Sequence, residues 1–253
     1  MLIIVDHKIP DEAKEELMLS FSQDSAVLLE LETDGLVYPA ISGHPDIFFC
    51  QAPQTLVVSP NLPERYLNLL DQHKITYVKG HIHTGEIAND KKNGSQSIQL
   101  KQKKAAENKA MTCYNAAINN QFLVHRLEYT EPVILENCHF LKKIAVKQGY
   151  TRCNLMLLKD SHYITSDQGI DLVLKSAGLN GLYVSPENIV LPGFPNGFIG
   201  GAMGLYQNSI YFTGSLKYLP GGEEIAAFIK GLGYRVTELY DGPLFDGGGI
   251  LFI

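Results

Sequence analysis

The chain ends in Asp246-Gly247-Gly248-Gly249-Ile250-Leu251-Phe252-Ile253, an apolar run that follows a glycine triplet and has no turn or cap after it. It begins with Met1-Leu2-Ile3-Ile4-Val5, a second bare apolar run. Apolar chain ends are poorly ordered unless a sheet ties them down. We therefore expect both ends to be strands of one structural unit that the two termini divide.

A repeated pattern fills the chain between these ends. Its order is strand, short polar turn, strand, amphipathic helix, strand, and short apolar runs bounded by Gly, Pro and Asn support each strand. The first unit has strands at Asp46–Cys50 and Thr55–Ser59, a helix at Pro63–His73 and a strand at Ile75–Val78. The next three units repeat this order at Tyr114–Ile118, Phe122–His125, Pro132–Leu141 and Ile144–Lys147; at Asn154–Leu158, Tyr163–Thr165, Gly169–Ser176 and Leu182–Ser185; and at Ala202–Tyr206, Ser209–Thr213, Gly222–Gly231 and Arg235–Leu239.

The fifth unit closes across the termini. Its first strand is Gly249–Ile253, its second Leu2–Val5, its helix Pro10–Phe21 and its third strand Ala26–Glu30. Such units cannot bury their apolar faces alone and must pack against one another. We therefore predict one α/β domain over residues 1–253, a five-fold pseudosymmetric α/β propeller of ββαβ units around a central channel, closed by the N- and C-terminal strands.

Composition narrows the range of partners and compartments. With 45% hydrophobic residues among 253, the chain can bury a large core, and its net charge of −6 argues against general binding of nucleic acid or anionic membranes. No apolar run approaches the roughly 20 residues of a membrane span, and the first residues do not resemble a signal peptide. Four cysteines without a Cys-x-x-Cys pair indicate reduced thiols. We expect a cytoplasmic protein.

A polar insertion is predicted at about residues 86–110, between the first and second units. Ala88–Ala110 holds six lysines among Gly, Ser, Asn and Gln residues. Contact with RNA is one interpretation, but the stretch lacks the aromatic side chains that stack on single-stranded bases. A solvated surface insertion is therefore favoured, and no nucleic-acid partner is predicted.

The terminal motif carries a resemblance to a known family. Gly247–Ile253 looks like the closing Gly-Gly-Gly-x-His-Cys strand of the pentein fold, the guanidine-modifying enzyme superfamily. That group includes arginine and agmatine deiminases, dimethylarginine hydrolases, amidinotransferases and a non-catalytic ribosome-binding translation factor. The segments Gly149–Asn154 and Gly197–Ala202 resemble a bacterial branch of this fold without the C-terminal catalytic Cys. The resemblance covers nearly the whole chain and implies the same ring of five units.

The resemblance also implies site residues, and one of them is replaced here. Phe252 stands where the family has its nucleophilic Cys, and a phenyl ring cannot form a thiouronium intermediate. His44-Pro45-Asp46 resembles the family's His-x-Asp, in which His is the general acid/base and Asp pairs with the guanidinium. Carboxylates hold planar cations through bidentate hydrogen bonds, and His titrates near neutrality. In the alternative interpretation, Asp46 caps a turn before a buried strand and His44 is a surface loop residue.

Cys153 is the best remaining candidate nucleophile. It begins a predicted inner strand, and the neighbouring Arg152 could depress the pKa of its thiol, because the thiolate is the reactive form. Strand alternation would place Cys153 and Asn154 on opposite faces. Alternatively Cys153 fills core, since free Cys is among the most buried residue types. Cys50 and Cys113 are weaker candidates.

Other polar or small residues could line the predicted channel and bind a ligand: Asn115, Asn154, Asp167, Gly200, Gly201 and Asp246. Asp167 has a competing role as the N-cap of the helix that follows it. The glycines could admit a ligand close to the backbone or relieve crowding near the axis.

No cofactor or metal is predicted. The chain has neither a Gly-x-Gly-x-x-Gly motif between a strand and a helix nor a Walker sequence. His81 and His83 would share one strand face, but no third and fourth ligand is evident, and a metal centre needs them.

Two functions remain open. The first is binding of a small cationic guanidino- or amidino-type ligand in the central pocket, with possible hydrolysis or amidino transfer at a C–N bond by His44, Asp46 and Cys153. The second is a non-catalytic binding or scaffold protein of the same fold, which the loss of the terminal Cys motivates. Fold alone does not determine which one applies.

Overall fold

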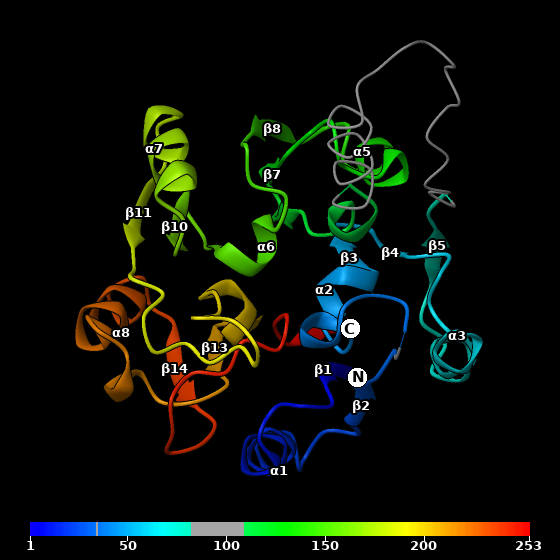
Figure 1. The fold of residues 1–253 in the computed structure, drawn as a ribbon, viewed down its shortest axis with the longest axis horizontal. Coiled ribbons are helices and arrows are strands. Elements are labelled where there is room, and N and C mark those ends of the chain that lie inside the picture. Colours follow the sequence, from blue (N-terminus) through cyan, green and yellow to red (C-terminus); the bar gives the residue numbers. More distant parts are fainter. Residues whose placement is uncertain (34, 82–108) are drawn as a thin grey trace.

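The computed structural model describes residues 1–33, 35–81 and 109–253, which form five three-stranded sheets (Figure 1). Every sheet has the same order, with its first strand antiparallel to the second and its second parallel to the third. The helices of the five units lie on the outside of this arrangement (Figure 1). The predicted repeat of five ββαβ units in a propeller-like fold is confirmed.

The elements of each unit follow the predicted order. The first unit comprises β3 (Phe49–Ala52), β4 (Thr55–Val58), α3 (Glu64–Gln72) and β5 (Tyr77–Lys79). The second comprises β6 (Ala117–Ile118), β7 (Phe122–His125), α5 (Pro132–Asn137) and β8 (Lys142–Ala145). The third comprises β9 (Leu155–Leu157), β10 (His162–Thr165), α7 (Gln168–Ser176) and β11 (Asn180–Tyr183). The fourth comprises β12 (Met203–Tyr206), β13 (Ser209–Phe212), α8 (Gly222–Gly231) and β14 (Arg235–Glu238).

The fifth unit joins the two ends of the chain. It comprises β15 (Leu251–Phe252), β1 (Leu2–Asp6), α1 (Asp11–Ser20) and β2 (Val27–Leu31). Strands β15 and β1 pair antiparallel, with Ile3 opposite Phe252, and the N and C ends lie close together (Figure 1). Backbone hydrogen bonds of 2.7 and 2.8 Å link Leu2 and Ile253 in both directions. The predicted closure through the terminal strands is therefore confirmed.

The apolar core is divided among the spaces between the sheets and their helices. Beneath α1, Leu17 and Phe21 pack with strand residues Ile3 and Val5 and with Phe252. The Phe252 ring lies 5.2 to 5.6 Å from the rings of Phe21, Tyr206 and Tyr211. The Phe252 ring thus fills core between the fourth and fifth units.

The starts of the inner strands differ from the prediction. A helical turn precedes three of them: α2 (Pro45–Phe48), α6 (Thr151–Asn154) and the 3-10 helix η2 (Gly200–Ala202). The expectation that Asp46 and Asn154 begin strands is therefore wrong, and strand alternation does not govern Cys153 and Asn154. In α2 the cause is local, because Pro45 is preorganised for the first turn of a helix. Two further 3-10 turns are η1 (Pro39–Ile41) and η3 (Leu216–Tyr218).

Two predictions about organisation stay predictions. Residues 86–108 of the expected insertion lie outside the described residues, as do Ile82 and His83, and the single-domain boundary at 1–253 is not tested. Within residues 1–33, 35–81 and 109–253, none of the helices combines the length and apolarity needed to cross a bilayer.

Candidate functional site

Three side chains from two helical turns meet at the centre of the ring. His44 is the residue just before α2, Asp46 lies in the first turn of α2, and Cys153 lies in α6 of the third unit. Their candidate ligand atoms (imidazole nitrogen, carboxylate oxygen and sulfur) all lie within 4.8 Å of one another. Each residue is at most 2% exposed, so the interpretation of His44 as a surface loop residue is wrong.

The thiol and the carboxylate are directly bonded. The Cys153 Sγ–H group donates to Asp46 Oδ2 at 2.9 Å. Asn115 fixes this pair, because its Nδ2 donates to Cys153 Sγ at 3.3 Å and to the Asp46 carbonyl at 3.3 Å. Its Oδ1 also accepts from the Cys153 backbone N–H at 3.2 Å. The structure thus brings four of the predicted site residues together: His44, Asp46, Asn115 and Cys153.

Asp246 and Arg152 add opposite charges beside this group. Arg152 Nη1 lies 3.8 Å from Asp46 Oδ2 and donates to the carbonyls of Gly200 and Gly248 at 3.0 and 3.3 Å. Asp246 is fully buried, and its carboxylate accepts from the backbone N–H groups of Gly248 and Phe198 at 3.1 and 2.8 Å. A carboxylate held by two backbone donors is fixed in position, and so is the guanidinium held by two carbonyls.

The glycine pair in η2 serves this packing. A Cβ at Gly201 would overlap the Asp246 carboxylate, and a Cβ at Gly200 would overlap the Arg152 carbonyl. The two glycines therefore relieve crowding by the protein's own atoms, as the alternative interpretation of the sequence expected. A direct ligand contact at either glycine stays a prediction.

Asp6 is a member of the group that the sequence interpretation missed. It ends strand β1, is fully buried, and its Oδ2 lies 3.7 Å from His44 Nε2. Its other oxygen accepts from the Lys8 backbone N–H at 2.9 Å. The available signal in the sequence was a single carboxylate that closes the otherwise apolar run Leu2–Val5.

Burial dominates the ionisation of the group. It raises the pKa of Asp46 to about 6 and that of Asp246 to about 7, and it lowers the pKa of His44 to about 3. Burial, together with the nearby Asp46 and Asp246 carboxylates, holds the pKa of the Cys153 thiol well above its usual range. The expectation that Arg152 depresses the pKa of this thiol is therefore wrong, because desolvation of the thiolate outweighs the guanidinium.

Two predicted ligand-binding residues bond elsewhere. Asp167 caps α7 by accepting from the Ile170 backbone N–H at 2.8 Å, which confirms its alternative role. Asn154 donates to the Tyr150 carbonyl at 2.8 Å and accepts from the Ser166 hydroxyl at 3.2 Å. Both side chains hold the third unit together, and the hydrogen bonds that the structure shows do not join them to Cys153.

The remaining cysteines are free thiols in an apolar environment. Cys50, Cys113 and Cys138 lie in one hydrophobic cluster with residues of the first two units. Burial raises the pKa of Cys113 to about 12 and that of Cys138 to about 11. A raised pKa is common to all four thiols, so what distinguishes Cys153 from these three is its hydrogen bond to a carboxylate.

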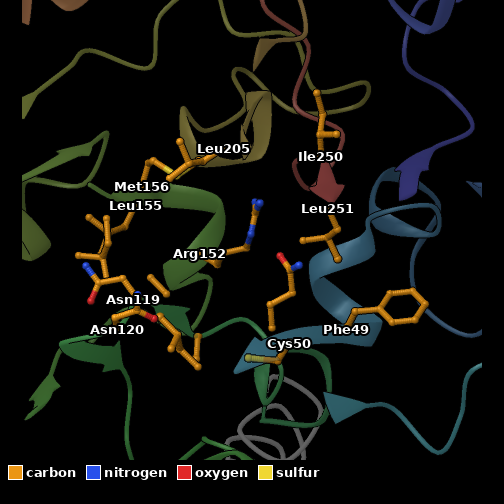
Figure 2. Close-up of a pocket in the computed structure, with 15 residues that line it drawn as sticks. Phe49, Cys50, Asn119, Asn120, Arg152, Leu155, Met156, Leu205, Ile250 and Leu251 are labelled. Carbon is orange, nitrogen blue, oxygen red and sulfur yellow. The ribbon is translucent and has the colours of Figure 1, made fainter. Parts of the chain in front are cut away.

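A cavity of about 260 Å³ lies between the inner strands, with Arg152 pointing into it (Figure 2). Strands from all five units contribute to its lining, through Gln51, Ala117, Met156, Leu205 and Leu251. The predicted central channel therefore exists as a cavity. His44, Asp46 and Cys153 do not line it.

An aromatic pair lies against the buried group. The hydroxyls of Tyr38 and Tyr150 are 3.3 Å apart, and the Tyr38 ring centroid is 5.9 Å from that of Phe194. Burial raises the pKa of both tyrosines, and the charges of Cys153 and Asp46 add to this effect. Both tyrosines are partly exposed.

The comparisons with known proteins agree with the fold. A family model described as "Family of unknown function (DUF6873)" matches residues 4–251. The chain belongs to this family. Among solved structures, a cysteine-to-serine mutant of DDAH from Pseudomonas aeruginosa complexed with citrulline matches with a TM-score of 0.53 and 10% identity, covering 94% of this chain and 91% of that one. At this identity the match supports a DDAH-like fold only. No curated protein matched the sequence.

Replacing Asp246 by asparagine should change how stability depends on pH. A carboxyl whose pKa is raised to about 7 favours the folded state below its usual pKa, and this contribution is lost as the pH rises through about 7. As the pH rises from about 4 to about 8, the free energy of unfolding of Asp246→Asn should therefore increase by about 1–3 kcal/mol relative to that of the wild type. Urea unfolding of both proteins at several pH values measures this difference.

The variant must be compared with the wild type at each pH, because titration of His44 changes the stability of both proteins in the opposite direction. The pKa of His44 is lowered, so its contribution is lost as the pH falls from about 6.5 towards about 3. Asp11→Asn on the exposed face of α1, where the carboxylate is 87% exposed, is the control. A difference between Asp246→Asn and wild type that stays constant over this range would contradict the raised pKa.

Proposed function

We propose that this protein is a thiol-dependent enzyme that acts at a C–N bond of a small guanidino or amidino compound. The observation that carries the proposal is the bonded pair of Cys153 and Asp46, with His44 in the same buried group. The DDAH-like fold supports it by analogy. In this proposal the thiol comes from α6, and the terminal strand has lost its nucleophile position to Phe252.

The charge of the site suits a planar cation. Asp6, Asp46 and Asp246 are each 0% exposed, and the Arg152 guanidinium lies 3.8 Å from Asp46. Asp46 Oδ1 has no hydrogen-bond partner, so it is free to accept from a ligand N–H group. An amidinium can bond to a carboxylate through two parallel hydrogen bonds, and in a desolvated site such bonds are strong.

The bonded pair supplies the nucleophile. Asp46 Oδ2 accepts the Cys153 proton, and the thiolate forms a bond to the central carbon of the amidinium. The C–N bond then breaks, and the leaving amine takes the proton held by Asp46. A bound cation assists the first step, because a positive charge near the sulfur lowers the pKa of the thiol.

His44 is the candidate proton acceptor in this scheme. Burial lowers its pKa to about 3, so the imidazole is neutral near neutral pH but a weak base, and it takes the proton of the attacking water only with the support of a nearby carboxylate. That water attacks the thiouronium carbon, the C–S bond breaks, and the sulfur is released as a thiol after proton return. An amine in place of water would give amidino transfer. Asp6, 3.7 Å from His44 Nε2, stabilises the imidazolium that forms.

Labelling with chloroacetamidine, which carries an amidinium and an alkylating carbon, tests the proposal. We expect one adduct, at Cys153, by peptide mass spectrometry, and its loss in Cys153→Ser. Asp46→Asn should slow labelling by about 100-fold, because the thiol loses its proton acceptor. Cys138→Ser, which removes a buried thiol outside the group, should label like the wild type.

Absence of an adduct at Cys153 would overturn the enzyme proposal. The burial of the site favours the second candidate, a non-catalytic binding protein, because Cys153 is only 2% exposed. A melting temperature that rises with agmatine or arginine, without any adduct or turnover, would support that candidate. If chloroacetamidine forms no adduct and neither agmatine nor arginine raises the melting temperature, a guanidino ligand is excluded.

A further inference from the structure

The geometry points to a second kind of ligand for the same buried group, a thiophilic divalent cation such as Zn²⁺, held by His44, Asp46 and Cys153. The three residues offer an imidazole nitrogen, a carboxylate oxygen and a thiolate, the donor set that zinc prefers. Asp46 comes from one helical turn of the first unit and Cys153 from another in the third, so the fold, not a local motif, creates the site.

The separations are close to those of a metal centre. The three donor atoms lie within 4.8 Å of one another, whereas ligands around a tetrahedral zinc ion are about 3.5 Å apart. Binding would therefore draw the three donor atoms closer together than they lie here. Three protein ligands would leave a fourth position open to water or to a substrate atom.

Unsatisfied polar atoms support the inference independently. Within the described part of the chain, five buried side-chain atoms lack a hydrogen-bond partner, and three of them are His44 Nδ1, His44 Nε2 and Asp46 Oδ1. Each unmade hydrogen bond in a buried site is costly, and native proteins contain few of them. A cation bound to one imidazole nitrogen and to Oδ1 would remove two of these defects.

Asp6 completes the arrangement expected around a metal-bound histidine. Such a histidine usually donates its other ring N–H to a carboxylate, which sets the tautomer and the ring orientation. Asp6 Oδ2 is also without a partner and lies 3.7 Å from His44 Nε2. This leaves His44 Nδ1 as the atom that binds the cation.

The charge balance permits a divalent ion. The carboxyl groups of Asp6, Asp46 and Asp246 and the Cys153 thiol are all buried, and the Arg152 guanidinium lies 3.8 Å from Asp46 Oδ2. Arg152 opposes a second cation, but it approaches Asp46 Oδ2 at 3.8 Å and is held there by two carbonyls. Oδ1, the oxygen assigned to the ion, has no such neighbour. Binding releases the thiol proton to solvent as the sulfur–metal bond forms.

The consequence is regulation of the proposed chemistry. A metal-bound sulfur is not available to attack carbon, so the ion would silence Cys153 until a chelator removes it. This consequence rests on the proposed function, whereas binding of the ion does not.

Binding is tested on chelator-treated protein with Co²⁺ and Zn²⁺ alone. We expect one Co²⁺ per chain with a thiolate-to-cobalt absorption band, displaced by Zn²⁺. Cys153→Ser should abolish the band, and His44→Gln should weaken binding at least about 10-fold. Cys138→Ser removes a buried thiol that lies outside the site, so this variant should bind the ions as the wild type does. On unaltered protein, Zn²⁺ should raise the melting temperature and block the chloroacetamidine adduct at Cys153, and a chelator should reverse both effects.

The outcomes separate the two proposals. Failure of the wild type to bind Co²⁺ or Zn²⁺, or equal binding by Cys153→Ser, would overturn the metal site. Stoichiometric metal with no adduct on the metal-free protein would support the metal site and overturn the enzyme proposal. An adduct at Cys153 on protein that binds neither ion would support the enzyme proposal and overturn the metal site.

Discussion

Replacing Phe252 with alanine is expected to lower the free energy of unfolding by about 3–5 kcal/mol. The ring is 8% exposed and packs against Phe21, Tyr206 and Tyr211 with centroid separations of 5.2 to 5.6 Å. These partners come from the helix of one unit and the strands of its neighbour, so the cavity left by alanine cannot close by a shift of one element. The same substitution also weakens the contact between β15 and β1 that joins the chain ends.

Urea unfolding of Phe252→Ala beside Phe140→Ala measures this effect. Phe140 is 52% exposed, so its loss should change the free energy of unfolding by less than about 1 kcal/mol. Similar effects of the two substitutions would contradict the role of Phe252 in closing the ring.

Phe252→Cys separates packing from chemistry at the same position. The substitution introduces the cysteine that the guanidine-modifying enzymes have in their closing strand. Position 252, however, lies in the aromatic core beneath α1. We expect loss of stability and no chloroacetamidine adduct at the new cysteine in the folded protein. A rapid adduct at position 252 would show that the terminal strand still faces a reactive site.

Replacing Arg152 with methionine is expected to destabilise the protein by about 3 kcal/mol near neutral pH. Its Nη1 bonds to the carbonyls of Gly200 and Gly248 and lies 3.8 Å from Asp46 Oδ2. Methionine keeps the length of the side chain but leaves two carbonyls without their donor and a buried carboxylate without its cation. The two carbonyls belong to the fourth and fifth units, so the loss loosens three units at once.

The pH dependence of this loss identifies its cause. The pKa of Asp46 is already raised to about 6, and removing Arg152 should raise it further. Below about pH 5 the carboxyl is protonated in the variant, so the deficit should shrink. Arg126→Met is the control, because Arg126 forms an exposed pair with Glu128 and should cost less than about 1 kcal/mol. A deficit independent of pH would assign the effect to the two carbonyl contacts alone.

Most of the architecture could be predicted because it depends on local patterns. Apolar runs of strand length, turns rich in Gly, Pro and Asn, and helices with one apolar side recur at similar spacing, and each is set by neighbouring residues. The bare ends Met1–Val5 and Gly249–Ile253 predicted closure, because unpaired apolar strands are unfavourable in water. The short turns α2 and α6 were missed, because four residues are too few to show a helical period.

The candidate site could be predicted only in part. The resemblance of His44-Pro45-Asp46 and the choice of Cys153 as candidate thiol named three residues whose candidate ligand atoms the structure places within 4.8 Å of one another, and their catalytic role stays a prediction. The direction of the thiol pKa was predicted wrongly from the adjacent Arg152, because adjacency in sequence does not reveal burial. Asp6 was missed because its partner His44 is distant along the chain.

The sequence by itself determined the repeat, the order of the elements and the closing pair of terminal strands, since these follow from periodicity and from the cost of exposed apolar ends. Only the tertiary structure decided the chemistry at the centre. Asp46 and Cys153 are 107 residues apart in the sequence, and they meet because the first and third units pack together in the folded ring. Their ionisation depends on how much water the surrounding units exclude, and the role of the terminal Phe252 depends on which rings surround it. Desolvation and long-range packing are properties of the assembled ring, so no single stretch of the chain contains them.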